Sequence, residues 1–347
     1  MKAGYRQILE AKREDRRPIF VEATEEWPTS ANFIEKDFIV CAALNVLFGD
    51  QPEEAGKLVF KGGTSLSKAH NLIRRFSEDI DLVIIRDELG FGGDRDPFAE
   101  DSPLSRKKHE RLVDEMREAA TKYVQDVLRP MLRDAFAPFG ATVEIDPKSD
   151  GQTVLIAYKS AFEGPDPYVR DIVKVEAGAR SATLPAHSTE ISPYAASVTP
   201  DIDLNVEGVR TVDAERTFLD KVLILHGRHC KFRDTGEIHR NANAESRHYY
   251  DLAMMVEDIG AGALANADLL ADVIRHTSVA FGSASMKMDE AARGDLLILP
   301  PDGMRDALKR DYTAMTGMIM GEAPTFDAIM EKIDQIAALH AKALQAR

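Results

Sequence analysis

Two short stretches of alternating apolar and polar residues frame a pair of glycines early in the chain. Val59-Phe60-Lys61 runs directly into Gly62 and Gly63, and Asp79-Ile80-Asp81-Leu82-Val83 follows after a segment rich in small and hydroxyl residues. Successive side chains on a strand point to opposite faces, so Asp79 and Asp81 face the same way. The pattern predicts a strand, a glycine turn, a short helix beginning near Leu66, and a strand with two carboxylates on one face.

Two neighbouring carboxylates repel each other unless a cation neutralises them. Mg²⁺ takes oxygen ligands and is usually held by one or two protein carboxylates together with substrate phosphates. Gly62 and Gly63 supply the other half of such a site, because glycine lets backbone amides approach a triphosphate closely, and Ser65 would add a hydroxyl donor. A glycine pair alone is only a turn, and two aspartates on a strand alone are more often a solvated face. Their order and short separation favour the active site of a nucleotidyltransferase.

Apolar periodicity elsewhere predicts a chain that mixes helices and strands. Residues 168–176 alternate and are rich in β-branched side chains, which predicts a strand with Ile172 on one face and Val173 and Val175 on the other. Residues 141–145 and 153–158 read as strands of the same sheet. Helices are predicted over residues 38–48, 103–136, 213–227, 245–256, 267–279, 302–320 and 325–344. The helix over 103–136 would bury a stripe formed by Leu112, Met116, Ala119, Tyr123 and Val127. The helix over 213–227 would end at a glycine.

Two further charged residues lie where the predicted elements give them a possible role in chemistry. Glu176 would be a third carboxylate beside Asp79 and Asp81, able to help hold a metal or to deprotonate an attacking hydroxyl. A solvent-facing strand end is the alternative for Glu176. Lys221 lies in the apolar middle of a predicted helix, where an unpaired ammonium is costly. A lysine in this position usually forms an ion pair. The functional alternative for Lys221 is to balance the negative charge of a triphosphate.

Arg247 and Asp251 are four residues apart in the helix predicted over 245–256, so they share one face. A surface ion pair between them would contribute little to stability. A role in substrate binding is the alternative.

The composition fits a cytosolic enzyme. The chain has 347 residues, of which 44% are hydrophobic, and this is enough for two lobes with substantial cores. No charge-free run approaches the length that spans a bilayer, and the first residues lack a signal-peptide core. Cys41 falls in a predicted apolar helix and Cys230 in a predicted polar loop, so we expect no disulfide.

Residues 228–247 form a locally basic segment in a chain whose formal net charge is −14. That charge argues against broad binding to nucleic acid, which depends on neutralising phosphates. A local patch can still bind a single RNA end, and we predict one here, helped by Lys57, Lys68, Arg74 and Arg75; an ordinary solvated loop is the alternative. The spacing of His226, His229, Cys230 and His239 matches no strong zinc pattern.

The stretch from Phe60 to Leu82, FKGGTSLSKAHNLIRRFSEDIDL, resembles the AbiEii/AbiGii-type toxins, which are bacterial nucleotidyltransferases of the DNA polymerase β-like superfamily. The gap between Gly63 and Asp79 is somewhat longer than the common spacing of that superfamily. The resemblance extends over nearly the whole chain, since further pieces agree in order at residues 34–38, 173–176, 220–221, 247–252, 311–318 and 321–326.

The resemblance implies roles that the residues alone leave open. Lys221 would contact the nucleotide phosphates, Asp251 would orient Lys221 or a substrate group, and Arg247 would touch the nucleotide or the acceptor. The resemblance also implies a toxin that is paired with an antitoxin and adds nucleotides to the 3′ end of tRNA.

We therefore predict an α+β protein, with a mixed-sheet nucleotidyltransferase lobe over residues 1–210 and a helical lobe over 211–347 that completes the nucleotide cleft. The expected cofactor is Mg²⁺ or Mn²⁺. The expected partners are an NTP, an RNA acceptor such as a tRNA end, and an antitoxin, with no membrane. The alternatives are a nucleotidyltransferase that modifies a protein or small molecule, and a catalytically inert nucleotide-binding module. The predicted catalytic residues are Asp79, Asp81, Glu176 and Lys221. The three acids among them are also the predicted metal ligands. The predicted nucleotide-binding residues are Gly62, Gly63, Thr64, Ser65, Lys68, Ser77, Lys221, Arg247 and Asp251.

Overall fold

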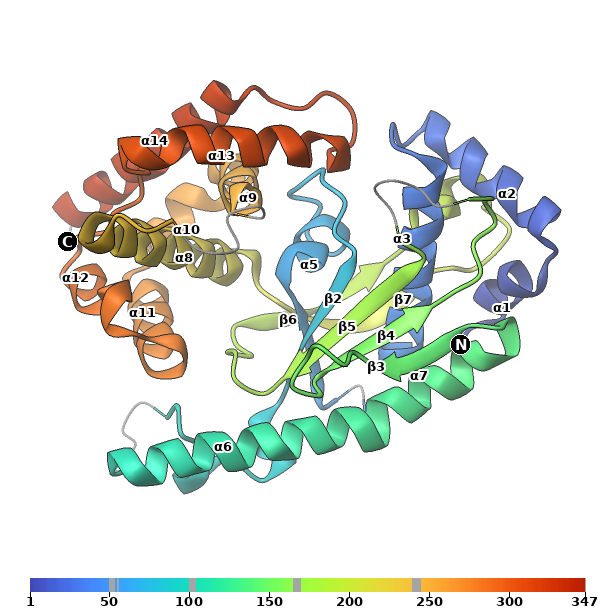
Figure 1. The fold of residues 1–347 in the computed structure, drawn as a ribbon, viewed down its shortest axis with the longest axis horizontal. Coiled ribbons are helices and arrows are strands. Elements are labelled where there is room, and N and C mark those ends of the chain that lie inside the picture. Colours follow the sequence, from blue (N-terminus) through green and yellow to red (C-terminus); the bar gives the residue numbers. More distant parts are fainter. Residues whose placement is uncertain (50–53, 55, 100–103, 165–169, 239–244, 347) are drawn as a thin grey trace. The chain divides into compact units, whose positions relative to one another are not determined.

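The computed structural model describes residues 1–49, 54, 56–99, 104–164, 170–238 and 245–346, and Figure 1 shows their fold. The chain divides into two compact units. The first comprises Met1–Asn71 and Arg75–Val212, and the second comprises Leu72–Arg74 and Asp213–Arg347.

The first unit is built on one mixed sheet, which has seven strands in the described residues, in the order β3-β4-β5-β2-β1-β7-β6. β2 lies near its middle, antiparallel to β1 and parallel to β5. The strands are β1 (Leu58–Lys61), β2 (Asp79–Ile84), β3 (Thr142–Ile145), β4 (Thr153–Ala157), β5 (Ile172–Gly178), β6 (Ala186–Ile191) and β7 (Val206–Val212).

The two central strands have one apolar and one polar face at their N-terminal ends. Ile80 and Leu82 of β2 and Val173 and Val175 of β5 are buried, as the alternation in the sequence predicts. The side chains that alternate with these buried residues, Asp81 on β2 and Lys174 on β5, are charged. One face of the sheet therefore forms core, while the other presents charged groups. The first residues of the strand predicted over 168–176 lie outside the described residues.

Helices cover the sheet of the first unit. In Figure 1, α6 and α7 follow one another as a long rod beside the sheet; α6 packs on β5 and α7 on β3, while α3 packs on β5 and β7. The helices of this unit are α1 (Ala3–Glu10), α2 (Arg13–Glu22), α3 (Ala31–Leu44), α5 (Gly62–Lys68), α6 (Arg106–Tyr123) and α7 (Arg129–Phe136).

The rod of α6 and α7 buries a different stripe from the one predicted. Leu112 and Met116 are buried as expected, but the stripe continues through Ala120, Val124 and Leu128 and not through Ala119, Tyr123 and Val127. A stripe at every fourth residue drifts around a regular α-helix. The wider π-helical turn Val124–Leu128 offsets part of that drift.

The second unit is helical. α8 packs on α9, α10 and α11, and α14 packs on α9 and α10. Its helices are α8 (Ala214–Thr235), α9 (Ser246–Met255), α10 (Ala261–Ala265), α11 (Ala267–Phe281), α12 (Met288–Ala292), α13 (Asp302–Met315) and α14 (Phe326–Gln345). Within the part of the chain that the structure describes, every helix is too short or too polar to cross a bilayer.

The prediction that α8 ends at Gly227 is wrong. The helix continues to Thr235 and ends at Gly236, whose φ of 68° terminates it. Gly227 serves packing instead, because a Cβ there would lie 3.2 Å from Cγ and Cε of Met286. Cys230 is consequently a buried helix residue and does not lie in a loop, and both cysteines are free, as expected.

Candidate active site

The three predicted carboxylates lie on one face of the sheet. Asp79 and Asp81 flank the buried Ile80 on β2, and β5 runs parallel beside them. In this register Asp79 lies opposite Lys174, and Asp81 lies opposite Glu176. Because residues paired across neighbouring strands share a face, the sheet gathers the three acids and Lys174 into one group, which we call the carboxylate row.

Asp79 in the carboxylate row has a perturbed pKa. Burial raises its pKa to about 6; the carboxylates of Glu78, Glu176 and Asp81 act in the same direction, and the ammonium of Lys174 opposes them. Its Oδ1 atom is buried and has no hydrogen-bond partner among the described residues. Both observations describe a carboxylate whose negative charge is poorly compensated.

The donor set of the carboxylate row suits a hard divalent cation. Among the described residues, no three His, Cys, Asp or Glu side chains form a ready-made metal cluster. Mg²⁺, however, usually takes one or two protein carboxylates and completes its shell with water and substrate phosphates. A cation would also neutralise the buried Oδ1 of Asp79. The residues therefore fit the predicted metal, with the substrate supplying the remaining ligands.

The glycine turn lies directly against the carboxylate row. Gly62 has a φ of 83°, and a Cβ at this position would lie 2.0 Å from Oδ2 of Asp81. A Cβ on Gly63 would lie 2.7 Å from Nη2 of Arg75 and 2.9 Å from Oγ of Ser77. Only glycine fits at position 62, and at position 63 a larger residue would have to displace the side chains of Arg75 and Ser77. The backbone of Gly62 is close enough to share a ligand with Asp81.

The helix after the turn begins earlier than predicted, at Gly62 and not near Leu66. Thr64 and Ser65 are buried inside it. The hydroxyl of Thr64 donates to the carbonyl of Ser77 at 3.3 Å, and that of Ser65 donates to the carbonyl of Gly62 at 2.9 Å. Both hydroxyls thus hold the turn and the segment before β2 in shape.

Lys68 lies in a buried ion pair. Its Nζ is 2.9 Å from Oδ1 of Asp37 on α3 and lies 3.6 Å from the centre of the Tyr194 ring. Burial alone would lower its pKa, but the charge of Asp37 outweighs this effect and raises the pKa. The contacts of Lys68 therefore anchor the end of α5 to α3.

The helical unit brings together two of the predicted residues. Nζ of Lys221 on α8 is 2.9 Å from Oδ2 of Asp251 on α9, and both side chains are buried, at 8% and 0% exposure. Arg247, one turn before Asp251 on the same helix, is exposed. The ion pair holds the ammonium group of Lys221 against Asp251.

The histidines of α8 have structural partners. Nδ1 of His226 accepts from the amide of Leu297 at 2.9 Å, and its Nε2 lies 3.0 Å from the carbonyl of Lys287. Nδ1 of His229 lies 2.9 Å from the carbonyl of Leu297, and its Nε2 lies 2.6 Å from the hydroxyl of Tyr249. Burial lowers the pKa of His229 to about 4. These neutral rings connect α8 to α9 and to the segments around Lys287 and Leu297. His239 of the weak zinc pattern lies outside the described residues.

The basic segment predicted over 228–247 differs from expectation. Residues 228–235 belong to α8, and residues 239–244 lie outside the described residues. Arg228 pairs with Glu245 at 3.4 Å, Lys231 with Glu237 at 3.8 Å, and Arg233 with Glu290 at 2.8 Å. Lys57, expected to help, pairs with Glu54 at 2.9 Å. Acidic neighbours therefore compensate most of the cations on which the predicted RNA patch depended.

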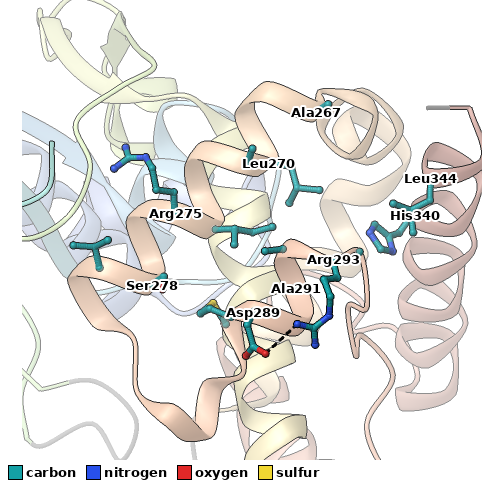
Figure 2. Close-up of a pocket in the computed structure, with 15 residues that line it drawn as sticks. Ala267, Leu270, Arg275, Ser278, Asp289, Ala291, Arg293, His340 and Leu344 are labelled. Carbon is teal, nitrogen blue, oxygen red and sulfur yellow. Dashed lines mark hydrogen bonds and ion pairs between the residues drawn. The ribbon is translucent and has the colours of Figure 1, made fainter. Parts of the chain in front are cut away.

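A large cavity lies within the helical unit, but it contains none of the predicted residues. It has a volume of about 600 Å³ and is lined by α11, α12 and the end of α14. Figure 2 shows that its lining is mostly apolar, including Leu270 and Leu344, with an ion pair of 3.2 Å between Asp289 and Arg293 at one side. The cavity has no group of converging polar side chains that would indicate catalysis.

Two lysines beside the carboxylate row, Lys174 and Lys36, were not predicted as site residues. Lys174 faces Asp79 across the strand pair, and Lys36 on α3 is fully buried and paired with Glu78. The alternation of residues 172–176 contained the signal for Lys174, since it sets Lys174 on the same face as Glu176. The pairing of Lys36 is long-range and left no local signal.

A mixed sheet with a row of acids beside a glycine turn is the arrangement of a nucleotidyltransferase. The sequence matches the model of the nucleotidyl transferase AbiEii toxin family, of type IV toxin–antitoxin systems, over residues 45–332, and the chain belongs to this family. The α+β fold resembles that of the nucleotidyltransferase toxin MenT4 from Mycobacterium tuberculosis H37Rv, with a TM-score of 0.52 and 16% sequence identity over 94% of this chain and 89% of MenT4. A search of curated proteins found no match.

Proposed function

We propose that this nucleotidyltransferase toxin uses Mg²⁺ or Mn²⁺, held by Asp79, Asp81 and Glu176, to transfer a nucleotide from an NTP to the 3′ end of tRNA. The observation that supports the site most directly is the contact of the glycine turn with the carboxylate row, because amides that can bind phosphate then lie beside carboxylate oxygens that can bind a metal. The choice of tRNA as acceptor rests on the family resemblance. The net charge of −14 favours a local RNA end over extended binding.

In the proposed reaction the oxygen of the acceptor hydroxyl attacks the α-phosphorus of the NTP. The bond between that phosphorus and the oxygen bridging to the β-phosphorus breaks, and pyrophosphate leaves. A cation bound to the carboxylate row would stabilise negative charge on the attacking and leaving oxygens. Glu176 takes the proton of the hydroxyl, because it is exposed while Asp79 and Asp81 are half-buried in the strand beside it.

The remaining predicted residues divide into phosphate contacts and supports. Gly62 and Gly63 offer amides to the triphosphate, with Ser77 beside Gly63. Lys221, oriented by Asp251, balances the charge of the nucleotide phosphates, and the exposed Arg247 contacts the nucleotide or the acceptor. Thr64, Ser65 and Lys68 act from behind, by holding the turn in shape.

The test compares the parent with Asp81→Asn, which keeps the shape of the side chain and removes its charge. Each protein is incubated with Mg²⁺, one labelled NTP at a time and total bacterial tRNA, and the products are resolved on a denaturing gel. We expect label on tRNA from the parent and a loss of about a hundredfold or more in the variant, the usual cost of removing one stabilising group. Asp134→Asn, an exposed aspartate of the same unit, is the control.

Other outcomes assign other functions. Label on a protein or a small molecule would give the enzyme a different acceptor and leave the carboxylate row unchanged. NTP binding without transfer to any acceptor would identify a catalytically inert module. An Asp81→Asn variant as active as the parent would contradict the metal assignment.

A further inference from the structure

A second basic surface lies beside the carboxylate row, in a cavity that the predictions did not include. The cavity has a volume of about 570 Å³ and belongs wholly to the first unit. Its floor is formed by Leu155 of β4 and Ile172 of β5. Four basic side chains line it: Lys36, Lys148, Arg170 and Lys174. We call it the β5 cavity.

The β5 cavity keeps an excess of positive charge. Of its two acids, Glu78 pairs with Lys36, and Asp146 accepts a hydrogen bond of 2.9 Å from the backbone amide of Lys148. Among the described residues, Lys148, Arg170 and Lys174 form no ion pair. In a chain with a formal net charge of −14, three such cations around one hollow are unusual, and they favour an anionic ligand.

The cavity and the glycine turn lie on opposite sides of the strand that holds the two aspartates. β2 has β1, which leads into Gly62, as one neighbour and β5 as the other. In the strand register, Lys174 of β5 lies opposite Asp79 of β2 on one side and opposite Leu155 of β4 on the other. The floor of the cavity therefore continues the sheet face that holds the carboxylate row. The acids therefore lie between two anion-binding features.

The chemistry of phosphoryl transfer gives these two sides different roles. The attacking and the leaving oxygen lie roughly in line on opposite sides of the phosphorus. If pyrophosphate leaves toward the amides of Gly62 and Gly63, the acceptor hydroxyl approaches from the side of β5. A strand of RNA that ends in that hydroxyl continues into the β5 cavity, where its phosphates meet the cations and its sugar and base meet Leu155 and Ile172.

We propose that the β5 cavity binds the last phosphodiester groups of the RNA acceptor, with Lys148 and Arg170 as direct phosphate contacts. This proposal rests on the proposed function and adds to it the place where the acceptor strand binds. The volume of the cavity is within the range of sites that hold a nucleotide-sized ligand. Lys36, buried and paired with Glu78, supports the wall of the cavity. Lys174 faces both the cavity and Asp79 and neutralises a third phosphate from the floor of the cavity.

The test uses the double variant Lys148→Ala/Arg170→Ala. Both side chains are exposed, so their truncation leaves the core intact. The control is Lys107→Ala/Lys108→Ala, which removes two equally exposed cations from α6, outside the cavity. We expect the KM for tRNA to rise about tenfold or more in the cavity variant, as the loss of two phosphate contacts requires. The kcat, the KM for NTP and all values for the control should stay within about twofold of the parent.

A second measurement separates failure of this proposal from failure of the proposed function. Binding of fluorescently labelled tRNA is titrated without NTP for the parent and both double variants. Weaker binding in the cavity variant alone would support the proposal even where no transfer is seen. A raised KM for NTP with an unchanged KM for tRNA would overturn it, because the cavity would then hold the triphosphate. Equal tRNA binding by all three proteins would also overturn it and would leave an acidic protein surface as the partner of these cations.

Discussion

Two acids of the carboxylate row have neighbours that determine their position or their pKa. Asp81 lies where the side chain of any residue other than glycine at position 62 would begin, so the turn and the acid form one contact. Burial, followed by the charges of Glu78 and Glu176, raises the pKa of Asp79 to about 6, and this pKa would be higher without Lys174. At this scale, Gly62 and Lys174 are as much part of the site as the acids.

Gly62→Ala tests the contact of Gly62 with Asp81. A φ of 83° costs an alanine about 1 to 2 kcal/mol, and its Cβ would also displace Oδ2 of Asp81. We expect transfer to fall by about a hundredfold, the scale of loss for a reacting group displaced by about an ångström. The rate of nucleotide transfer and the thermal unfolding midpoint are measured together.

Gly90→Ala is the matched control, because Gly90 has a φ of 80° and a Cβ there would meet no atom within 4 Å. Both variants bear a similar backbone strain, so both midpoints should fall, and that of Gly62→Ala should fall further because its Cβ also displaces Asp81. Only Gly62→Ala should lose activity. Equal activity in the two variants would show that the approach of Gly62 to Asp81 has no role in transfer.

Among the elements, α3 supports the site from behind with three consecutive buried charged residues. Glu35 accepts from the amide of Ala161 at 2.7 Å and from the hydroxyl of Ser160 at 2.6 Å. Lys36 pairs with Glu78 just before β2, and Asp37 pairs with Lys68 at the end of α5. Each charge ties the helix to a different segment. α3 therefore fixes the start of β2 relative to α5, and this keeps the glycine turn at the start of α5 against Asp81.

The sequence predicted those elements whose signals are local. The alternation around Asp79 and Val173 gave β2 and β5, and their apolar faces are buried as expected. The register that sets Asp81 opposite Glu176 depends on strand pairing, which periodicity does not encode. β6 was not predicted because residues 186–191 are mostly polar and half-exposed. β7 was not predicted either, and its place beside β1 comes from the tertiary fold.

Glycines caused two of the errors in the helix boundaries, since glycine ends some helices and lies inside others. At Gly62 the helix begins on the glycine itself, and at Gly227 the helix continues because the glycine makes room for Met286. Within the site, the acids and the turn were predictable from spacing. The compensation of the basic residues near 228–235 by Glu237, Glu245 and Glu290 was not, since two of these acids are distant in sequence.

The pair of α8 and α9 gives a prediction that separates structural from functional charge. Lys221→Met or Asp251→Asn alone leaves one buried charge without its partner, so each should destabilise the protein by roughly 3 kcal/mol. The double variant removes both charges and should recover part of that stability. We expect all three variants to have a raised KM for NTP, because the proposed function gives Lys221, oriented by Asp251, the role of phosphate contact. Urea unfolding and steady-state kinetics measure the two effects.

The double-mutant cycle can contradict this assignment plainly. If the double variant regains both stability and the parent KM for NTP, the pair is structural and Lys221 has no role in nucleotide binding. A change of kcat alone, with NTP use unchanged, would likewise exclude Lys221 as a phosphate contact.

For the whole molecule, the balance of charge limits how it can bind nucleic acid. The net charge of −14 repels a polyanion, and the cations of α8 are paired with acids. If the acceptor is RNA, as we propose, a chain of this composition binds it through a small set of cations next to the carboxylate row. The size of that set is measurable, because each phosphate contact releases counterions and adds to the salt dependence of binding.

The affinity for tRNA should therefore depend only weakly on salt. Three cavity cations, Lys148, Arg170 and Lys174, at about 0.7 per phosphate of a single strand predict a slope of about −2 in a plot of the logarithm of the association constant against that of salt concentration. Lys148→Ala/Arg170→Ala should reduce the magnitude of the slope to about 0.7, and Lys107→Ala/Lys108→Ala should leave it unchanged. Fluorescence titrations between 50 and 200 mM salt, roughly the range over which such slopes are defined, measure it. A slope several times steeper in the parent would mean that the RNA contacts a broad basic surface elsewhere, and that the β5 cavity is not its main site.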